Sequence, residues 1–517
     1  MPIFRTIKTN LYKDSVALMR IAQTVLQRDG VRRATLVMGT PANKDILAQA
    51  GLLDPELSKA RPGDVMIVVD AETGDVLDAA AAAIAGLLEG ERPPAASGSA
   101  AELPLRSIAM ACSRDGDAAA LAQISVPGPY AAAEAMKALR RGLHVFLFSD
   151  NVPLEQERAI KAVAREKGLL VMGPDCGTAI IAGTPLGFAN VVRRGAISLV
   201  GASGTGLQEV TSRIHALGHG IRHAIGTGGR DVSEEIGAIT MQQAIDLLAA
   251  DPGTRVIGIV SKPPAPAVAR QILERVGKID KPVLVLFLGD DLSARPLPRN
   301  VTAVSTLYDA AVAAIARLDG KDVIAAEDAG AWLRPVQGEA ARLAAGQRFV
   351  RGLYSGGTFC AEAQLVWREL GLSVHSNAPL DKRAAGIAPE GAHTAIDLGA
   401  DEFTVGRPHP MIDPSTRIDR IAAAARDSST AAIVLDVVLG YGSHPDPAGA
   451  LAPAISEARA ASAREGRYLP VVSFVCGTEE DPQHLSAQQA LLRSAGALVL
   501  PSSTAAARAA GEIALRA

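Results

Sequence analysis

Residues 196–218 read AISLVGASGTGLQEVTSRIHALG. The segment begins with a short apolar run of the kind found in buried strands, and a turn rich in glycine and serine follows it. After the turn, apolar residues recur at spacings of three and four, which is the period of an amphipathic helix. A buried strand that passes through a glycine turn into a helix is the unit of a parallel α/β sheet. The segment therefore predicts an α/β domain with a candidate ligand site at the turn.

A second copy of this pattern begins at residue 348 with RFVRGLYSGGTFCAEAQLVWRELG. Similar strand and glycine-turn segments follow each copy in the same order, and insertions lengthen the second one. Such a repeat indicates two related domains that face each other across one site. We expect flavodoxin-like domains over residues 191–318 and 345–517, related by an approximate two-fold axis.

The region before the repeat divides into two further domains. Residues 1–90 alternate between strand and helix patterns, which suits a small ferredoxin-like α+β domain. Residues 91–104 are rich in Pro, Ser, Ala and Gly without periodicity and are typical of a linker. Residues 105–190 resume the alternation and predict a Rossmann-like, doubly wound domain of nucleotide-binding type. The expected fold class of the chain is α/β.

Composition excludes several classes of protein. The chain has 517 residues, of which 48% are hydrophobic and 21% are charged, so it can bury several cores. A net charge of −3 gives no electrostatic footprint for nucleic acid, and the longest apolar run is too short to cross a membrane. Its 4 cysteines form no C-x-x-C pair, which argues against a disulfide scaffold and a cysteine zinc site. We expect a cytoplasmic protein without nucleic-acid or membrane partners.

The histidines do not indicate a metal site either. His215, His219 and His223 recur every fourth residue, as zinc ligands on one helix face would. Gly218 and Gly220 interrupt that helix, however, and no acidic ligand lies beside it. We therefore expect no bound metal.

Three glycine-rich turns are candidate sites for a phosphate or a carboxylate. Glycine lets an anion approach the backbone, and the N-terminus of the following helix offers free N–H groups. None of the turns ends in the Lys-Ser/Thr of a P-loop, so the sequence does not indicate ATP hydrolysis. An ordinary structural turn is the alternative for each. The candidate residues are Ser203, Gly204, Thr205 and Gly206, then Ser355, Gly356, Gly357 and Thr358, then Gly440, Gly442 and Ser443.

Further candidates lie at strand ends and in a turn upstream of the first copy. Gly228 and Gly229 in the first copy and Asp397 in the second occupy equivalent strand ends, which line the ligand crevice of such sheets. A tight turn explains them equally well. In the upstream turn, Asp175 could cap a helix or contact a ligand. Cys176 fits a small packed residue better than a nucleophile, because no histidine lies nearby in sequence.

Three residues are candidates for catalysis. Lys262 follows a strand end and could face a bound anion or simply be solvated. His409 lies in a proline-rich loop and His444 lies at a glycine turn, and either could donate a proton or bind an anion. An ordinary surface histidine is the alternative for both.

Residues 172–210, MGPDCGTAIIAGTPLGFANVVRRGAISLVGASGTGLQEV, resemble the α-subunit of succinyl-CoA synthetase, in which a Gly-Pro-Asn-Cys turn leads to a Ser-x-Ser-Gly-Thr phosphate loop. The second copy resembles the ligase domain of the β-subunit, with residues 440–444 aligned to its phosphate-binding glycine loop. With YKDSVALMR and VMGTPANKDIL near the N-terminus, the whole order is similar to that of the FdrA family of acyl-CoA-synthetase-like proteins. The resemblance spans nearly the whole chain. It implies a CoA-binding-type domain at residues 105–190 and partner subunits or a homo-oligomer.

Two departures from the synthetase bear on the activity. Residues 110–120, MACSRDGDAAA, stand where the synthetase has the glycine fingerprint of its CoA domain, which leaves CoA binding open. Residues 289–305 contain no histidine where the synthetase carries its phosphohistidine, and the ATP-grasp module is missing. A chain that keeps the phosphate-binding turns but lacks the phosphohistidine and the ATP-grasp module is suited to direct acyl transfer to or from phosphate.

The association of the FdrA family with ureide breakdown implies transfer of a carbamoyl group. We expect a subunit of an oxamate carbamoyltransferase, which converts oxalurate and phosphate to oxamate and carbamoyl phosphate and requires no cofactor. Its ligands would be phosphate and a small ureide or carboxylate. Two alternatives stay open: an NDP-forming acyl-CoA synthetase that uses a partner's ATP module, and a non-catalytic scaffold that binds an anion or CoA.

Overall fold

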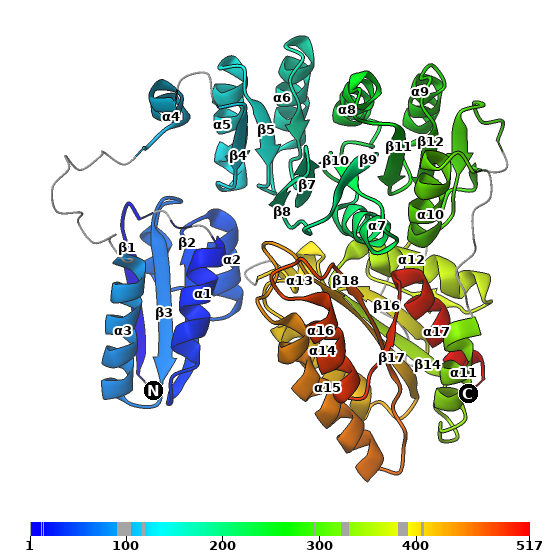
Figure 1. Cartoon of the computed structure of the whole chain (residues 1–517). Helices are drawn as coiled ribbons and strands as arrows, with labels where there is room; N and C mark the ends of the chain where they lie inside the picture. Colours follow the sequence, from blue (N-terminus) through cyan, green and yellow to red (C-terminus); the bar gives the residue numbers. More distant parts are fainter. Residues whose placement is uncertain are drawn as a thin grey trace. The chain divides into compact units, whose positions relative to one another are not determined.

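The structure is a computed structural model that covers most of the chain in detail (Figure 1). The residues that it describes are 2–11, 13, 15–89, 105–115, 119–292, 295–321, 330–380, 391–404 and 408–516. The chain divides into two units, Met1–Met110 with Asp401–His409, and Ala111–Ala400 with Pro410–Ala517. The predicted linker at residues 91–104 lies outside the described residues, as does part of the 110–120 segment.

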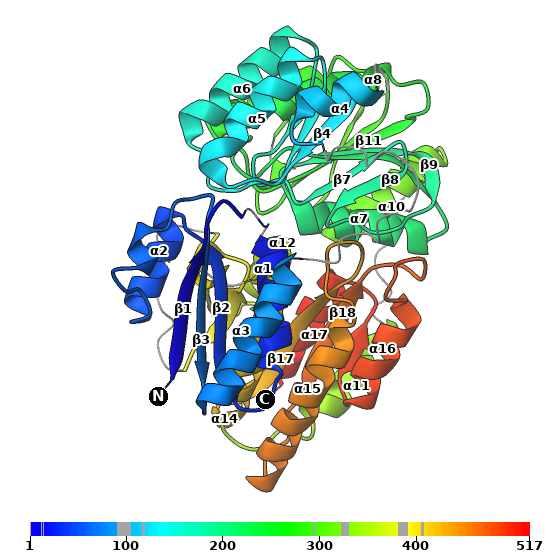
Figure 2. The same cartoon turned by 90° about the vertical axis from the view of Figure 1, so that its left-hand side faces the viewer.

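The elements of the first unit are β1 (Ile3–Lys8), α1 (Ser15–Leu26), β2 (Val31–Met38), α2 (Pro41–Gln49), β3 (Val65–Ala71), α3 (Gly74–Glu89) and α13 (Asp401–Thr404). The sheet is antiparallel in the order β1-β3-β2. Ile67 and Val69 of the central strand pack with α1 and α3, whereas Met66 and Val68 face the side of α2 (Figure 2). Burial on both faces explains why this strand reads as one apolar run. The predicted small α+β domain is confirmed, with three of the four strands of a ferredoxin-like sheet among the described residues.

The second unit begins with a parallel sheet of β4 (Leu121–Ile124), β5 (His144–Leu147) and β6 (Val171–Met172), connected by α5 (Gly128–Arg140) and α6 (Leu154–Glu166). The three strands lie side by side in the order in which they occur along the chain. A doubly wound sheet reverses its strand order at one point, so this part of the described chain is Rossmann-like but lacks the reversal that we predicted. The reason is that the chain leaves this sheet after β6, and its next strand pairs in another sheet.

That next sheet contains β7 (Thr178–Ile181), β8 (Thr184–Gly187), β9 (Arg194–Gly201), β10 (Ile221–Gly226), β11 (Val256–Ser261), β12 (Val283–Phe287) and β13 (Val301–Ala303), with helices α7 (Gly204–Ala216), α8 (Ile239–Ala250), α9 (Pro266–Val276) and α10 (Leu307–Leu318). Its order is β13-β12-β11-β9-β10-β7-β8. The strands from β9 to β13 are parallel in the flavodoxin order 2-1-3-4-5, as predicted. The β7–β8 hairpin pairs antiparallel with β10, so this sheet starts before the boundary expected at residue 191.

The last sheet contains β14 (Phe349–Tyr354), β15 (Val374–His375), β16 (His393–Asp397), β17 (Thr430–Val438), β18 (Val471–Cys476) and β19 (Leu498–Leu500), with helices α11 (Gly330–Ala340), α12 (Gly357–Glu369), α14 (Ser415–Arg426), α15 (Pro447–Arg464), α16 (Leu485–Ser494) and α17 (Ser503–Leu515). Its order is β15-β16-β14-β17-β18-β19, and all neighbours are parallel. Without the two-residue edge strand β15, the remaining five strands again have the flavodoxin order 2-1-3-4-5, so the predicted duplication is confirmed.

The two flavodoxin-like domains share one hydrophobic core. Leu207 and Val210 of α7 belong to the same buried cluster as Phe359 and Ala363 of α12. The equivalent helices pack in pairs, α7 with α12 and α10 with α17 (Figure 1). This pairing brings the first turns of α7 and α12 together.

In the part of the chain that the structure describes, no helix combines the length and the apolar character needed to cross a lipid bilayer.

Candidate functional site

The start of α7 presents an open set of backbone donors. Ser203 is the N-cap, in an extended conformation, and its Oγ accepts a hydrogen bond of 3.2 Å from the Gly206 N–H. Gly204 and Thr205 are the first helix residues, whose N–H groups have no intrahelical acceptor. Gly204 is exposed to solvent. The first turn of α7 therefore offers an accessible anion-binding position.

The first turns of α7 and α12 contact each other symmetrically. A Cβ atom on Gly206 would lie 3.1 Å from Thr358 Cγ2, and one on Gly356 would lie 2.8 Å from Thr205 Cγ2. Each threonine thus packs against the glycine of the opposite helix. Ser203 Oγ and Thr358 Oγ1 are 2.6 Å apart and share a hydrogen bond. Two of the three predicted turns are therefore in direct contact.

The two N–H groups that immediately precede the first helical residue of α12 are already used inside the fold. The N–H groups of Ser355 and Gly356 donate to the Asp436 carboxylate at 2.8 and 3.1 Å, and Ser355 Oγ donates to it at 2.6 Å. Arg417 Nη2 also donates to Asp436, at 3.0 Å, and all of Asp436 is buried. We therefore correct the prediction that Ser355 and Gly356 bind phosphate, because the protein supplies its own carboxylate to them.

A second carboxylate lies against the same helix start. A Cβ atom on Gly357 would lie 2.6 Å from Asp397 Oδ2, and Asp397 Oδ1 accepts from the Gly399 N–H at 3.0 Å. Asp397 therefore places negative charge at the positive end of α12, and its predicted contact with a ligand stays a prediction. The two equivalent helix starts differ in this respect: α12 is faced by carboxylates of the protein, and α7 remains open.

The Gly440 turn packs on the strand-like segment before β9. Gly440 has φ +104° and Gly442 has φ +81°, which favour glycine at both positions. A Cβ atom on Gly440 would lie 2.5 Å from Ala189 O, and one on Gly442 would lie 2.8 Å from the Phe188 ring. The Tyr441 N–H donates to Ala189 O at 3.0 Å. These close contacts explain the two glycines on steric grounds.

Asn190 connects this turn to α7. Its Nδ2 donates to Leu439 O at 3.0 Å, and its Oδ1 accepts from Gln208 Nε2 of α7 at 3.2 Å. Thr178 forms a second connection, since its Oγ1 donates to Phe188 O at 2.8 Å and lies 3.3 Å from the Cβ position of Gly204. The predicted Ser203 and Gly440 turns are therefore neighbours.

Two buried residues that the sequence did not indicate hold the Gly440 turn. Gln483 accepts from the Gly440 N–H and donates to Gly440 O, both at 3.0 Å, and donates to His444 O at 3.2 Å. Asp481 accepts from Asn190 Nδ2 at 2.8 Å and from the Val191 N–H at 2.7 Å, and burial raises the pKa of its carboxyl. Their segment, GTEEDPQHL, reads locally as a polar surface turn, so no pattern separates them from their solvated neighbours.

His444 is placed to keep its outer ring nitrogen protonated. Its Nδ1 accepts from the Asp446 N–H at 3.0 Å, so the neutral ring carries its proton on Nε2. Ser443 Oγ is buried without a hydrogen-bond partner. The N-terminus of α15, which follows, is capped by Asp446, whose Oδ1 accepts from the Gly449 N–H at 3.0 Å. This capping carboxylate corrects our expectation of an anion cradle at that helix.

The other predicted strand-end residues pack around the upstream turn. A Cβ atom on Gly228 would lie 2.2 Å from Pro174 O, so this glycine is required for close approach, and Gly229 is exposed beside it. Cys176 is buried, and desolvation raises the pKa of its thiol to about 12. It therefore stays a thiol near neutral pH and fits the packed residue that we favoured. Asp175 is exposed, at φ +54°.

One of the three candidate catalytic residues is not joined to this site. Lys262 is exposed after the end of β11, and no hydrogen bond or ion pair connects it to the Ser203 turn within the described residues. His409 belongs to the first unit, and its catalytic role stays a prediction. His444 is the candidate that the structure brings to the Gly440 turn.

Two glutamates lie at equivalent positions one turn further along α7 and α12. Glu209 and Glu362 are both buried. Glu362 accepts from the Leu307 N–H at 2.8 Å and from Ser503 Oγ at 2.5 Å, and Glu209 accepts from the Ser503 N–H at 3.3 Å. Burial, with Glu209 nearby as a smaller cause, raises the pKa of Glu362 to about 7. The pair ties the starts of α10 and α17 to the helices of the site.

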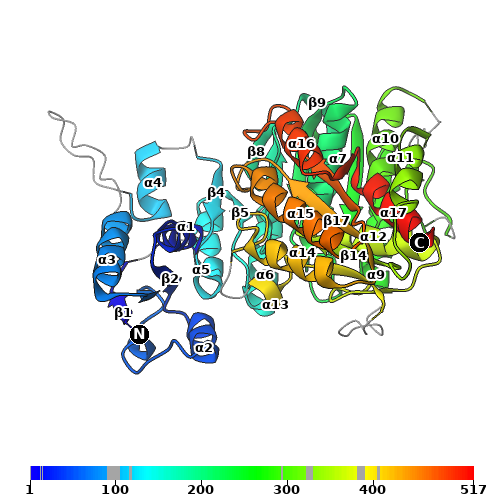
Figure 3. The same cartoon turned by 90° about the horizontal axis from the view of Figure 1, so that it is seen from below.

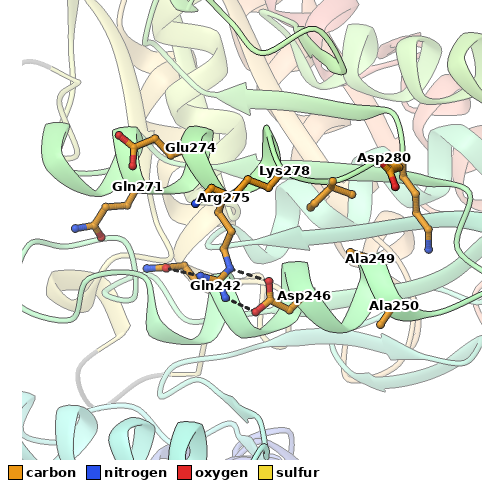
Figure 4. Close-up of a pocket in the computed structure, with 11 residues that line it drawn as sticks. Gln242, Asp246, Ala249, Ala250, Gln271, Glu274, Arg275, Lys278 and Asp280 are labelled. Carbon is orange, nitrogen blue, oxygen red and sulfur yellow. Dashed lines mark hydrogen bonds and ion pairs between the residues drawn. The ribbon is translucent and has the colours of Figure 1, made fainter.

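A groove of about 750 Å³ lies elsewhere, between α8 and α9 (Figure 4). Arg275 spans it and forms ion pairs with Asp246 and a hydrogen bond of 3.3 Å with Gln242. Its lining mixes acidic and basic side chains and includes none of the predicted site residues. Its arginine is already neutralised, so we do not place the active site there.

Models of three protein families match the chain. The model described as AllF, heavy metal-associated domain, matches residues 1–104. The model of a CoA binding domain matches residues 193–289, and that of CoA-ligase matches residues 353–513. The CoA-binding model thus covers the first flavodoxin-like domain, and not residues 105–190, where we expected the CoA-binding type.

Relatives extend the same pattern. The chain is 44% identical over 508 residues to the uncharacterized protein YahF of Escherichia coli K12, covering 98% of this chain and 97% of that one. It is 29% identical over 174 residues to the mitochondrial succinate–CoA ligase [ADP-forming] subunit alpha-2 of Trichomonas vaginalis, covering 32% of this chain and 55% of that one. A solved apo structure of a dinucleotide forming acetyl-coenzyme A synthetase 1 from Candidatus Korarchaeum cryptofilum is 17% identical, with a TM-score of 0.29, over 77% of this chain and 83% of that one.

The N-terminal residues do not fit a heavy metal. Residues 1–104 contain neither cysteine nor histidine, the ligands that such ions prefer. Among the described residues, no group of three or more His, Cys, Asp or Glu side chains could hold a metal ion. We therefore assign no metal chemistry to the matched domain.

Proposed function

Because the chain belongs to the FdrA-like family of acyl-CoA-synthetase-like proteins, we propose that it transfers a carbamoyl group between a ureide and phosphate. The reaction that we assign converts oxalurate and phosphate to oxamate and carbamoyl phosphate. The match of an AllF domain model to the N-terminal residues agrees with a place in ureide breakdown. We further propose that the chain works with partner subunits or as a homo-oligomer.

The observation that carries the proposal is the open start of α7. Its exposed first residue Gly204 and the N–H groups there would bind phosphate, and the helix dipole would favour the negative charge. The equivalent start of α12 is faced by Asp436 and Asp397, so one phosphate is expected, at α7. Residues 289–305 contain no histidine that phosphate could convert to a phosphohistidine, which supports transfer in one step.

In this reaction a phosphate oxygen attacks the ureido carbonyl carbon of oxalurate. The new C–O bond forms as the bond from that carbon to the oxamate nitrogen breaks, and the nitrogen takes up the proton that phosphate gives up. Negative charge develops on the carbonyl oxygen during the attack, and the N–H groups at the start of α7 would stabilise it. His444, with a proton on Nε2, would donate a hydrogen bond to the reacting ureide, while phosphate itself passes its proton to the leaving nitrogen.

The second candidate function is an NDP-forming acyl-CoA synthetase that uses the ATP module of a partner. The matches to CoA-binding and CoA-ligase models favour it. A scaffold that binds an anion or CoA without catalysis is the third, and the carboxylates at the starts of α12 and α15 are compatible with it.

One experiment separates the three functions. The full chain is incubated with oxalurate and phosphate, and carbamoyl phosphate is measured; a parallel reaction contains CoA, ATP and a panel of carboxylic acids. Carbamoyl phosphate formation that disappears without phosphate supports the transferase. Acyl-CoA formation would establish the synthetase, and phosphate or CoA binding without turnover would favour the scaffold.

A further inference from the structure

A small pocket lies at the carboxyl ends of β18 and β19, beside the C-terminal half of α7. Its volume is about 280 Å³. Helices α7 and α16, both labelled in Figure 3, each contribute lining residues. The carboxyl ends of parallel strands are where α/β sheets bind ligands. The lining residues are Arg213, Ala216, Val475, Gly477, Leu485, Gln489, Arg493, Val499, Leu500 and Pro501.

The two charged side chains of this lining are both basic, although Arg213 also pairs with Glu209, behind the lining, at 3.4 Å. Arg213 and Arg493 line the pocket, and none of its ten lining residues is acidic. The groove between α8 and α9 differs, because its Arg275 is paired with Asp246 at the lining itself. The α7–α16 pocket therefore favours an anionic ligand.

Arg213 has hydrogen-bonding capacity that the fold leaves unused. Its side chain is 15% exposed, and its Nε is buried without an acceptor. Its Nη2 reaches the buried Glu209 at 3.4 Å, which is long for a charge-assisted hydrogen bond. A carboxylate in the pocket would accept from the Nη groups of Arg213, because the buried Nε has no surface that a ligand could reach.

Apart from Gln489, whose Oε1 accepts a hydrogen bond of 3.3 Å from Arg493, the rest of the lining carries no polar side chain. Val475, Leu485, Val499, Leu500 and Pro501 surround the space beside the two arginines. These side chains would bury a hydrocarbon chain but offer nothing to the remaining oxygens of inorganic phosphate. The volume is below the range of about 300–1,000 Å³ that holds drug-sized ligands, so the ligand is small.

We propose that this pocket binds a short aliphatic monocarboxylate, with its carboxylate on Arg213 and Arg493 and its chain among the apolar side chains. The inference is independent of the proposed reaction. Gly204 lies nine residues before Arg213, which places the two sites about 13 Å apart along the helix. A carboxylate and a phosphate can therefore occupy α7 at the same time.

The test is isothermal titration calorimetry of the full chain with butyrate, repeated with saturating phosphate present. We expect saturable binding of one butyrate per chain that phosphate does not displace, and no binding of butylamine, which has the same chain and the opposite charge. Displacement by phosphate would place butyrate at the start of α7 and overturn the proposal. Absence of saturable binding would also overturn it.

Variants locate the site without relying on a residue that the fold needs. Arg493 and Ala216 are exposed, so Arg493→Met and Ala216→Phe should fold normally. Arg493→Met should weaken butyrate binding about tenfold, as expected for loss of a hydrogen bond to a charged group, and Ala216→Phe should block the entrance. Arg275→Met, in the other groove, and Gly204→Val, at the phosphate position, should leave butyrate affinity unchanged. Unchanged affinity in both Arg493→Met and Ala216→Phe would refute the assignment.

Discussion

Ser203 Oγ and Thr358 Oγ1 lie 2.6 Å apart, although 155 residues separate them in the chain. The contact joins the first turns of two duplicated domains. Ser203 is 6% exposed and also caps α7 through the Gly206 N–H, so its hydroxyl has a structural role beside any role in binding. Loss of this hydroxyl should therefore lower the stability of the fold as well.

The first prediction concerns this contact. Ser203→Ala should lower the free energy of unfolding by about 1–2 kcal/mol, because a helix cap and a buried hydrogen bond are lost together. A double-mutant cycle with Thr358→Val, measured by urea unfolding, should give a coupling energy of about 1 kcal/mol. Thr40 caps α2 in the first unit and provides the control, since Thr40→Ala should add to Ser203→Ala without coupling. If the effects of Ser203→Ala and Thr358→Val add as fully as those of Ser203→Ala and Thr40→Ala, the contact between Ser203 and Thr358 does not stabilise the fold.

The second prediction concerns the carboxylate at the start of α12. Asp436→Ala should destabilise the protein by about 3–5 kcal/mol, because Arg417 would stay buried without its partner. The vacated position would keep a guanidinium and two N–H groups, so formate should raise the unfolding temperature of this variant more than that of the wild type. Thermal unfolding at matched ionic strength checks this. Equal effects of formate on both proteins would show that the position is not an anion site.

The third prediction concerns pH. Burial raises the pKa of Glu362 from 4.5 to about 7, so the folded state holds this proton over a pH range in which the unfolded state has released it. Its contribution to stability is therefore present at low pH and is lost as the pH rises from about 4.5 to about 7. Glu362→Gln should remove that part of the pH dependence. Urea unfolding of both proteins between pH 5 and 8 measures the difference, and parallel curves would contradict the prediction.

Local patterns in the sequence were sufficient to predict the duplicated domains. Residues 196–218 and 348–371 each carry a strand, a glycine turn and a helix, and these are short-range signals. Whether the second turn is free to bind an anion depends on Asp436. This carboxylate accepts a hydrogen bond from the N–H of Ser355, which lies 81 residues earlier in the chain. In the sequence AAIVLDVVLG, Asp436 is a single polar residue within an apolar strand. That local pattern does not predict which residues it contacts.

The same distinction explains the rest of the site. Asn190 bonds Leu439 and Asp481 across 249 and 291 residues, so its role exists only once the two domains pack. Helix starts can be predicted from local spacing, but which of them stays open depends on carboxylates brought by other strands and turns. The sequence therefore identified three turns as equal candidates, and the structure leaves α7 as the open one.

The fourth prediction concerns CoA. Residues 110–120 lack the glycine fingerprint of a CoA domain, so we expect the Rossmann-like part to bind CoA weakly or not at all. The CoA binding domain model matches residues 193–289 instead, which makes the full chain the right protein to titrate. Calorimetry of the full chain with CoA is the measurement. Micromolar affinity would contradict the prediction and favour the synthetase over the transferase.

The central claim is that phosphate binds at the open start of α7, and Gly204→Val tests it most directly. A Cβ atom there would already lie 3.3 Å from Thr178 Oγ1, so a branched side chain would crowd the position that phosphate needs. Gly74 is the first residue of α3, is exposed and has open space around its Cβ position, which makes Gly74→Val the matched control. We predict that calorimetry finds one phosphate per chain for the wild type and Gly74→Val, affinity weakened by about 1–3 kcal/mol in Ser203→Ala, and no measurable binding in Gly204→Val. Phosphate affinity that Gly204→Val leaves unchanged would contradict the account.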